Sequence, residues 1–318
     1  MLTIKCPKYN KDLSTRKKEL ISNLDEWITS DALLRLIELF DGDVNSFRQM
    51  DIKSYRKNAI LFSKMWDYRK KNNAVERMFL NNDEFIEKNK EEILKCVEEL
   101  GFIGKYKVDD EKEASYILPL GGARFTNLHR PLMAKKVLDE NGWQSKVIAL
   151  TGIRPLQEME LESVRTYSDG NNEYEAMCDG MRQAFDIKLY NKVITEHENI
   201  FLQEHNCFSE DGQVGVVAAP SQDPSRRANS VDTYRYFLNK YPYKEGDKVI
   251  LVTSAIYVPV QMAQFIKFAL ENEIEADIVG VDEIISGERY SKAVNYLQEV
   301  KATLDCLERL YKQYDEEK

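Results

Sequence analysis

From Ala114 onward the sequence repeats one unit: a short apolar run ends in a glycine, serine or proline cluster and is followed by a helical pattern. This repeat is typical of βαβ units, in which a crossover helix links two parallel strands. The runs lack strict alternation of apolar and polar residues, as expected for strands that helices cover on both faces. The five predicted strands are Ser115 to Leu120, Lys146 to Leu150, Val214 to Ala219, Val249 to Thr253 and Ala276 to Val281.

Helical patterns lie beside these strands along the chain. The predicted helices are Arg130 to Glu140, Glu173 to Phe185, Val231 to Tyr241, Val260 to Glu271, and Ser291 to about Tyr314. Because crossovers between parallel strands are right-handed, this order predicts an α/β fold with an open, Rossmann-like, doubly wound and mostly parallel five-stranded sheet. We interpret the polar stretch Asn191 to Gly212, which is longer than an ordinary connection, as a lid or a further cap.

The first hundred residues have a different pattern. Apolar residues recur at helical spacing in several stretches, and Gly101 stands at the expected end of the last one. We therefore expect two parts. A helical N-terminal cap or extension covers residues 1–110, and a Rossmann-like domain with a C-terminal helix covers residues 111–318.

Charge and composition narrow the classes of partner. The net charge of -9 argues against nucleic acid, because phosphate binding normally uses a clustered basic surface. The chain has neither an apolar run of 18 residues nor a signal-like start, so we expect a cytoplasmic protein with no membrane partner and a small anionic ligand. The five cysteines form no CxxC pair and the three histidines show no metal-site spacing, which predicts free thiols and no metal. Oligomeric state is left open.

Two glycine-containing loops follow the first two predicted strands. Gly121 and Gly122 allow a tight turn and close backbone approach, and Arg124 and Arg130 near the next helix start suit a phosphate or carboxylate. The alternative is a merely tight turn. Gly152 and Arg154 repeat this arrangement after the second strand.

Carboxylates and further arginines follow later in the chain. Glu175 is either a proton-transfer group or a residue that favours the positive end of its helix. Asp223 is the second candidate catalytic carboxylate, and Arg226, Arg227 and Asn229 share its loop after the third strand. These residues either contact a ligand or form surface ion pairs.

The loop after the fourth strand supplies hydroxyl groups. Thr253, Ser254 and Tyr257 follow a very apolar run and either contact a ligand or cap the next helix. Ser254 does not stand in a GxSxG motif, so a Ser-His-Asp triad lacks support.

In this order the loops resemble the YdcF/SanA/ElyC-like family, known as domain of unknown function 218, over about residues 115–281. The matching features are Gly121-Gly122, Arg130, Gly152, Glu175-Ala176-Met177, Ser230-Val231-Asp232-Thr233, and Val252-Thr253-Ser254 with Pro259. The family often has a histidine and an arginine in the last loop, where this chain has Tyr257 and Val260, and Arg226 or Arg227 would compensate.

The resemblance implies a Rossmann-like fold and an anionic, nucleotide-like ligand, with S-adenosylmethionine or a nucleotide as the expected cofactor. Three functions remain open at this point. The chain is an enzyme that holds an anionic substrate with its arginines, a non-catalytic protein that binds a nucleotide or S-adenosylmethionine, or an interaction protein whose helical N-terminus binds a partner.

Overall fold

The computed structural model describes residues 1–72, 79–104, 108, 111–282 and 292–315, and these residues form two compact units. Unit 1 contains residues 1–105, 255–267 and 282–318, and unit 2 contains residues 106–254 and 268–281. The units do not follow the chain in a simple order, because the C-terminal helix belongs with the N-terminal helices. The predicted boundary near residue 110, between a helical N-terminal part and a Rossmann-like domain, therefore remains a prediction.

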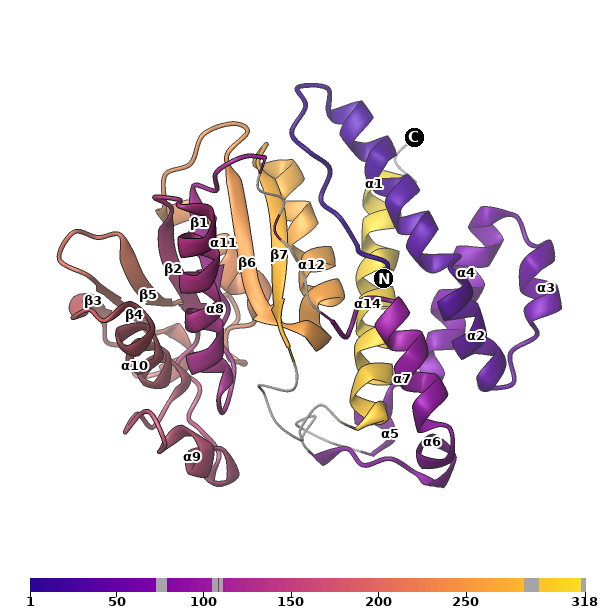
Figure 1. Cartoon of the computed structure of the whole chain (residues 1–318), viewed down its shortest axis with the longest axis horizontal. Helices are drawn as coiled ribbons and strands as arrows, with labels where there is room; N and C mark the ends of the chain where they lie inside the picture. Colours follow the sequence, from indigo (N-terminus) through magenta and orange to yellow (C-terminus); the bar gives the residue numbers. More distant parts are fainter. Residues whose placement is uncertain (73–78, 105–107, 109–110, 283–291, 316–318) are drawn as a thin grey trace. The chain divides into compact units, whose positions relative to one another are not determined.

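Unit 2 is built on a mixed seven-stranded sheet with the order β3-β4-β5-β2-β1-β6-β7 (Figure 1). Five strands are parallel: β1 (Tyr116–Pro119), β2 (Lys146–Thr151), β5 (Val214–Ala218), β6 (Lys248–Ser254) and β7 (Glu275–Val281). These strands lie where the apolar runs predict them. The α/β class is thus confirmed.

The prediction of a five-stranded sheet is wrong, because an antiparallel hairpin extends one edge. Strands β3 (Tyr190–Thr195) and β4 (Glu204–Phe208) pair with each other, and β4 pairs with β5. They occupy the stretch interpreted as a lid or cap. All six residues of β3 are exposed, so this strand has no buried face that would impose an apolar pattern on its sequence.

Helices pack on both faces of this sheet. On one face, α8 (Thr126–Asn141) and α10 (Glu173–Phe185) enclose an apolar cluster with the strands. On the other face, Phe237 of α11 (Ser230–Lys240) packs edge-on against Tyr116 of β1. The short helix α9 (Glu158–Val164) lies between β2 and α10 along the chain.

The close packing of α8 against α10 depends on Gly180. A Cβ atom at this position would lie 1.8 Å from the carbonyl oxygen of Asn127, which is far inside van der Waals contact. Only glycine therefore permits this approach. The contact fixes the position of the first turn of α10, where the carboxylates of the site begin.

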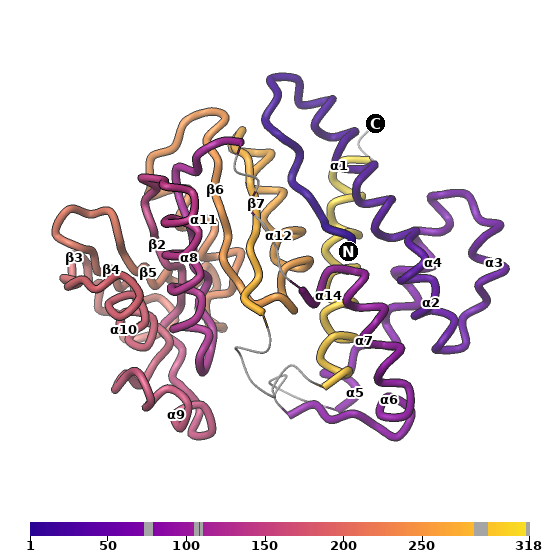
Figure 2. Tube along the Cα trace, viewed as in Figure 1, coloured from indigo at the N-terminus to yellow at the C-terminus, as the bar shows by residue number. Residues whose placement is uncertain are grey.

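Unit 1 is helical, as predicted for the N-terminal part. Its elements are α1 (Leu13–Ile28), α2 (Asp31–Leu39), α3 (Val44–Gln49), α4 (Ile52–Ser63), η1 (Lys64–Trp66), α5 (Tyr68–Lys71), α6 (Glu84–Lys88), α7 (Lys90–Glu99), η4 (Ala255–Tyr257) and α14 (Ala293–Tyr314), with residues 258–267 of α12 (Val258–Glu271). Figure 2 shows the yellow trace of α14 running beside the violet traces of the N-terminal helices.

A charged network holds α14 to these helices. Arg56 of α4 pairs with Asp25 of α1 at 2.5 Å and with Asp315 at 2.6 Å, and its guanidinium lies over the Tyr311 ring at 4.2 Å. Within the described residues, no helix has the length and apolar character needed to cross a membrane.

Candidate functional site

The loops that follow the parallel strands lie together at the carboxyl ends of the strands, because parallel strands share the same direction. We call this end of the sheet its carboxyl edge. Backbone hydrogen bonds join these strand ends directly: Leu120 N–H donates to Val252 O at 2.9 Å, and Gly121 N–H donates to Leu150 O at 2.6 Å. A Cβ atom on Gly121 would lie 2.5 Å from Thr151 Oγ1. The structure therefore brings the ends of β1, β2 and β6 together, as the loop pattern predicts.

Arg130 joins two of these strand ends from the interior. Its side chain is 2% exposed, and it donates to the carbonyl oxygens of Leu120 at 2.5 Å and Gly121 at 2.7 Å, and to Ser254 Oγ at 3.2 Å. These contacts tie the end of β1 to the end of β6. In the order of the parallel strands this is the point where successive connections change direction.

The Gly121-Gly122 loop is fixed by Asn127, a residue that the sequence analysis missed. Gly122 N–H donates to Asn127 Oδ1 at 3.0 Å, and Asn127 Nδ2 donates to Gly122 O at 2.8 Å. Since Gly121 N–H is also engaged, the amides of both glycines are used within the protein. The loop is thus held in one conformation, and a ligand would contact side chains rather than these two amides.

Arg154 is held in place by two carboxylates. Its terminal nitrogens contact both oxygens of Glu160 at 3.0 and 3.1 Å, and its Nε donates to Glu173 Oε1 at 2.8 Å. The side chain of Glu160 is 1% exposed, so this pair is buried. Glu160 is therefore a structural partner that orients Arg154.

Glu173 is the most unusual carboxylate at this edge. Burial raises its pKa above the ordinary value, and the charges of Arg154 and then Arg227 only partly offset this effect. The described residues donate no hydrogen bond to its second oxygen, Oε2. This oxygen is the nearest described atom to the position of a Cβ on Gly152, at 4.0 Å, so the small residue leaves space beside it.

Sequence reasoning selected Glu175 instead of Glu173. Glu175 is exposed, and its Oε2 accepts a hydrogen bond from Asn171 N–H at 2.6 Å. Helical spacing could have separated the two, because Glu173 shares a face with the buried residues Ala176, Met177 and Gly180. Glu175 lies on the polar face of the same helix.

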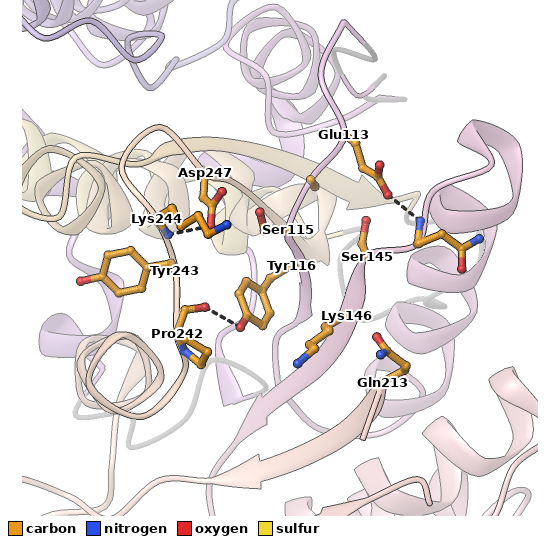
Figure 3. Close-up of a pocket in the computed structure, with 12 residues that line it drawn as sticks. Glu113, Ser115, Tyr116, Ser145, Lys146, Gln213, Pro242, Tyr243, Lys244 and Asp247 are labelled. Atoms are coloured by element: carbon orange, nitrogen blue, oxygen red, sulfur yellow. Dashed lines mark hydrogen bonds between the residues drawn. The ribbon is translucent and has the colours of Figure 1, made fainter. Parts of the chain in front are cut away.

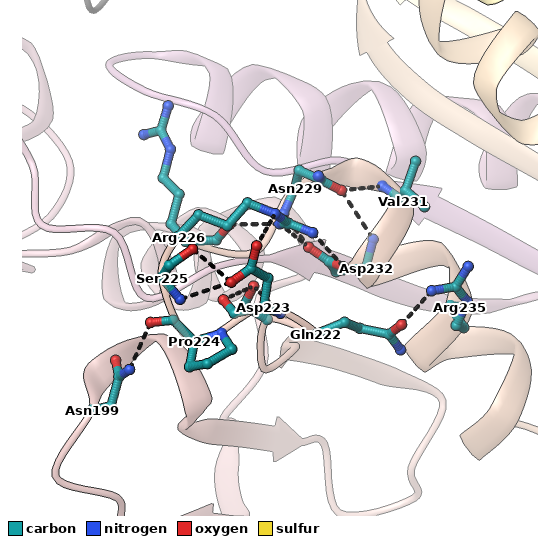
Figure 4. Close-up of polar contacts among 12 residues, drawn as sticks. Asn199, Gln222, Asp223, Pro224, Ser225, Arg226, Asn229, Val231, Asp232 and Arg235 are labelled. Carbon is teal, nitrogen blue, oxygen red and sulfur yellow. Dashed lines mark hydrogen bonds and ion pairs between the residues drawn. The ribbon is translucent and has the colours of Figure 1, made fainter.

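The third loop forms its own ion-pair network (Figure 4). Arg226 contacts both oxygens of Asp232, at 2.5 and 3.2 Å, and Asp232 is 2% exposed. Although burial opposes its ionisation, the hydrogen bonds from Arg226 and Asn229 N–H hold the pKa of Asp232 below its usual range. Arg226 and Asn229 therefore tie the loop to the start of α11, where Asn229 caps the helix.

The carboxylate of Asp223 forms hydrogen bonds within the same loop. It accepts hydrogen bonds from Ser225 Oγ at 2.6 Å and Ser225 N–H at 2.9 Å, and these bonds lower its pKa. A lowered pKa makes a carboxylate a weaker proton acceptor at neutral pH. Arg227, which is exposed, is the residue of this loop whose charge acts on Glu173.

The remaining predicted residues are placed as follows. Arg124 has a left-handed backbone with φ of 54°, and its guanidinium lies 3.5 Å from Met159 O, toward α9. Thr253 is fully buried at the end of β6, and the structure shows no hydrogen bond to its hydroxyl from the described residues. Tyr257 is part of unit 1, so it is described apart from these loops.

A hollow of about 800 Å³ lies at the opposite edge, where the parallel strands begin (Figure 3). Two of its carboxylates already accept backbone hydrogen bonds, Glu113 from Gln144 at 2.6 Å and Asp247 from Lys244 at 2.8 Å. We place the candidate site at the carboxyl edge instead, because buried ionised side chains from several elements converge there.

Comparison with known families concerns the other unit. Residues 11–101 match the family model of the Rv3785 N-terminal domain. This match falls outside the loops on which the resemblance to the YdcF/SanA/ElyC-like family was based, and that assignment is wrong. The loop motifs were each short and of common composition, so their order alone did not specify a family. Neither the curated proteins nor the solved structures contain a match to this chain.

Proposed function

We propose that unit 2 binds a small organic anion at the carboxyl edge of its sheet and that Glu173 exchanges a proton with it. The observation that carries this proposal is the Glu173 carboxyl group, whose side chain is only 16% exposed and which contacts Arg154 through one oxygen and leaves the other beside Gly152. The order of the parallel strands, β5-β2-β1-β6-β7, supports a Rossmann-like reading, in which ligands bind at this edge.

Arg227 is the proposed contact for the anionic group. It is exposed, and its positive charge favours the ionised form of Glu173, which supports placing the ligand anion and the proton exchange in one site. Arg154 has a different task, because Glu160 and Glu173 already occupy its guanidinium. It fixes the Glu173 side chain in one orientation, which lowers the entropy cost of binding.

The raised pKa of Glu173 suits proton transfer. General acid and base catalysis is most efficient when the pKa of the group approaches the working pH, and burial moves Glu173 in that direction. The substrate class that fits is a small molecule that has a phosphate or carboxylate and also a hydroxyl or amino group that exchanges a proton with Oε2.

A non-catalytic binding protein is the second candidate. It is favoured by the positions of Asp223 and Glu175, which both accept hydrogen bonds from nearby backbone N–H groups. In that case Arg227 would still bind the anion, and Glu173 would act only as a partner of Arg154. Nucleotides and S-adenosylmethionine remain proposals for the ligand in both cases.

The test begins with a thermal-shift screen against inorganic phosphate, AMP, S-adenosylmethionine and 3-phosphoglycerate, followed by calorimetric titration of the compounds that stabilise the protein. Arg227→Ala should weaken binding of those compounds roughly tenfold or more, as loss of a charge-assisted hydrogen bond does. Unchanged affinity in this variant would refute the anion site.

The matched pair Glu173→Gln and Glu175→Gln separates the two candidate functions. Turnover of a bound compound that falls at least about a hundredfold in Glu173→Gln and stays within about twofold in Glu175→Gln supports proton transfer by Glu173. The reverse pattern would assign the role to Glu175. Tight binding without turnover in the parent protein would favour the non-catalytic candidate.

A further inference from the structure

Two buried cysteines meet inside unit 2, although 29 residues separate them in the sequence. The Sγ atoms of Cys178, on α10, and Cys207, on β4, lie 3.1 Å apart. Their side chains are 4% and 0% exposed. A covalent S–S bond measures about 2.05 Å, so a movement of about 1 Å would bring the sulfur atoms to bonding distance.

The scattered cysteines predict free thiols, and both residues are unbonded in this structure. Their proximity was not foreseen, because the pair spans a helix and a hairpin strand rather than a short motif such as CxxC. The sheet places β4 next to β5, under the face that α10 covers. The fold thus brings two thiols together whose spacing in the sequence does not predict a pair.

The two thiols have different acidities. The hydrogen bond with Cys178 lowers the pKa of Cys207 to about 7 despite burial. The same hydrogen bond, together with burial, raises the pKa of Cys178. The Cys207 sulfur is therefore the one that ionises more readily to a thiolate nucleophile, and Cys178 is the neighbouring thiol.

We propose that Cys178 and Cys207 form a reversible intrachain disulfide when the protein meets a peroxide, and that this bond ties helix α10 to strand β4. The Cys207 thiolate attacks one peroxide oxygen, the O–O bond breaks, and the leaving oxygen departs as water after taking up a proton. The Cys178 sulfur then attacks the sulfenic sulfur, the S–O bond breaks, and the departing hydroxide takes the Cys178 proton and leaves as a second water. In total, two thiols and one hydrogen peroxide give one disulfide and two waters.

The experiment counts thiols in the full chain with Cys6→Ser, which removes the partly exposed cysteine and so prevents crosslinks between molecules through it. The protein is treated with hydrogen peroxide at neutral pH, quenched, unfolded and labelled with N-ethylmaleimide. The expected label count falls from four to two, mass mapping finds the Cys178–Cys207 peptide pair, and dithiothreitol restores four labels. Four labels after peroxide treatment would overturn the proposal.

Cys96 and Cys306 are internal controls, because both are buried in unit 1 and neither lies beside a second sulfur among the described residues. The Cys178–Cys207 pair should oxidise at least about tenfold faster than either control, given the larger thiolate fraction at a pKa of about 7. Equal rates at all four thiols would indicate oxidation of unfolded chains and would refute a prepared pair.

Single variants test the order of the two steps. In Cys178→Ser, which keeps a hydrogen-bonding group beside Cys207, Cys207 should accumulate as a sulfenic acid that dimedone traps. In Cys207→Ser, Cys178 should retain its label after the same treatment. Dimedone adducts at Cys178 rather than Cys207 would contradict the assigned nucleophile.

Discussion

Neighbouring residues of the same type have different environments in the third loop of unit 2. Arg226 contacts the buried carboxylate of Asp232, whereas Arg227 is exposed and acts on Glu173 through its charge. A sequence shows two adjacent arginines and gives no means of distinguishing them, because the difference arises from the start of α11 and the first turn of α10. The loop therefore has one arginine paired with a buried carboxylate and one whose side chain is exposed to solvent.

This difference predicts unequal effects on stability. Arg226→Ala should lower the free energy of unfolding by about 1–2 kcal/mol, because it leaves the buried Asp232 with only its backbone hydrogen bonds. The estimate is at the low end of the range for charged groups, since the Arg226 side chain is 40% exposed and solvent screens the pair. Arg227→Ala should cost no more than about 0.5 kcal/mol. Urea unfolding of both variants checks this, and equal losses would count against it.

The raised pKa of Glu173 predicts a specific dependence on pH. A carboxyl group with a higher pKa in the folded protein binds its proton more tightly there, so its contribution to stability falls as pH rises from the ordinary value of 4.5 through the folded pKa. The stability of the parent protein relative to Glu173→Gln should decrease over that window and level off above it. Urea unfolding at several pH values measures this difference. A difference that rises over that window would contradict the burial argument.

At the scale of elements, two glycines near the site have opposite tolerance for a side chain. Gly180→Ala should destabilise the protein by about 1–3 kcal/mol, because its Cβ would overlap the Asn127 carbonyl oxygen unless α8 and α10 separate. Gly152→Ala should fold normally, since its Cβ has Glu173 Oε2 as nearest neighbour at 4.0 Å. Thermal melting of the two variants provides the test. A stable Gly180→Ala protein would show that the helices can move apart without cost.

Elements with a buried face could be predicted from the sequence. The five parallel strands and α10, which begins at Glu173 and ends at Phe185 as predicted, follow apolar runs or helical spacing that burial imposes. Strand β3 escaped prediction because its six residues are all exposed. The glycine-containing loops placed the candidate site at the carboxyl ends of the strands, which stays a prediction, and Glu160 and Asn127 were missed. Their partners are set by tertiary contacts rather than by local sequence.

At the scale of the whole molecule, the helical unit draws on both ends of the sequence. Helix α14 contributes buried apolar side chains such as Leu297, Val300 and Leu304, and it packs against α1, α4 and α7. The segment that matches the Rv3785 N-terminal domain model, residues 11–101, contains the N-terminal helices without α14. Its apolar faces would be exposed to water in isolation.

A fragment of residues 1–104 should therefore have low helical content alone, because isolated helices are marginal without tertiary packing. Adding a peptide of residues 292–315 should increase the helical signal beyond the sum of the two parts. Circular dichroism of the separate and mixed chains measures this. A variant peptide with Leu297→Asp and Leu304→Asp is the control, since charged side chains cannot enter the apolar contact. Full helicity of the fragment by itself would contradict the prediction.

The exposed strand β3 has a consequence for how copies of this protein behave at high concentration. An open sheet edge can template pairing with another chain and so begin aggregation. In β3 the pairing register shifts between Asn191 and Val193, and the charged Lys192 stands at that irregularity. A bulge twists the edge and a lysine makes burial of a second strand unfavourable, so the hairpin that widens the sheet also protects it against fibril-like growth.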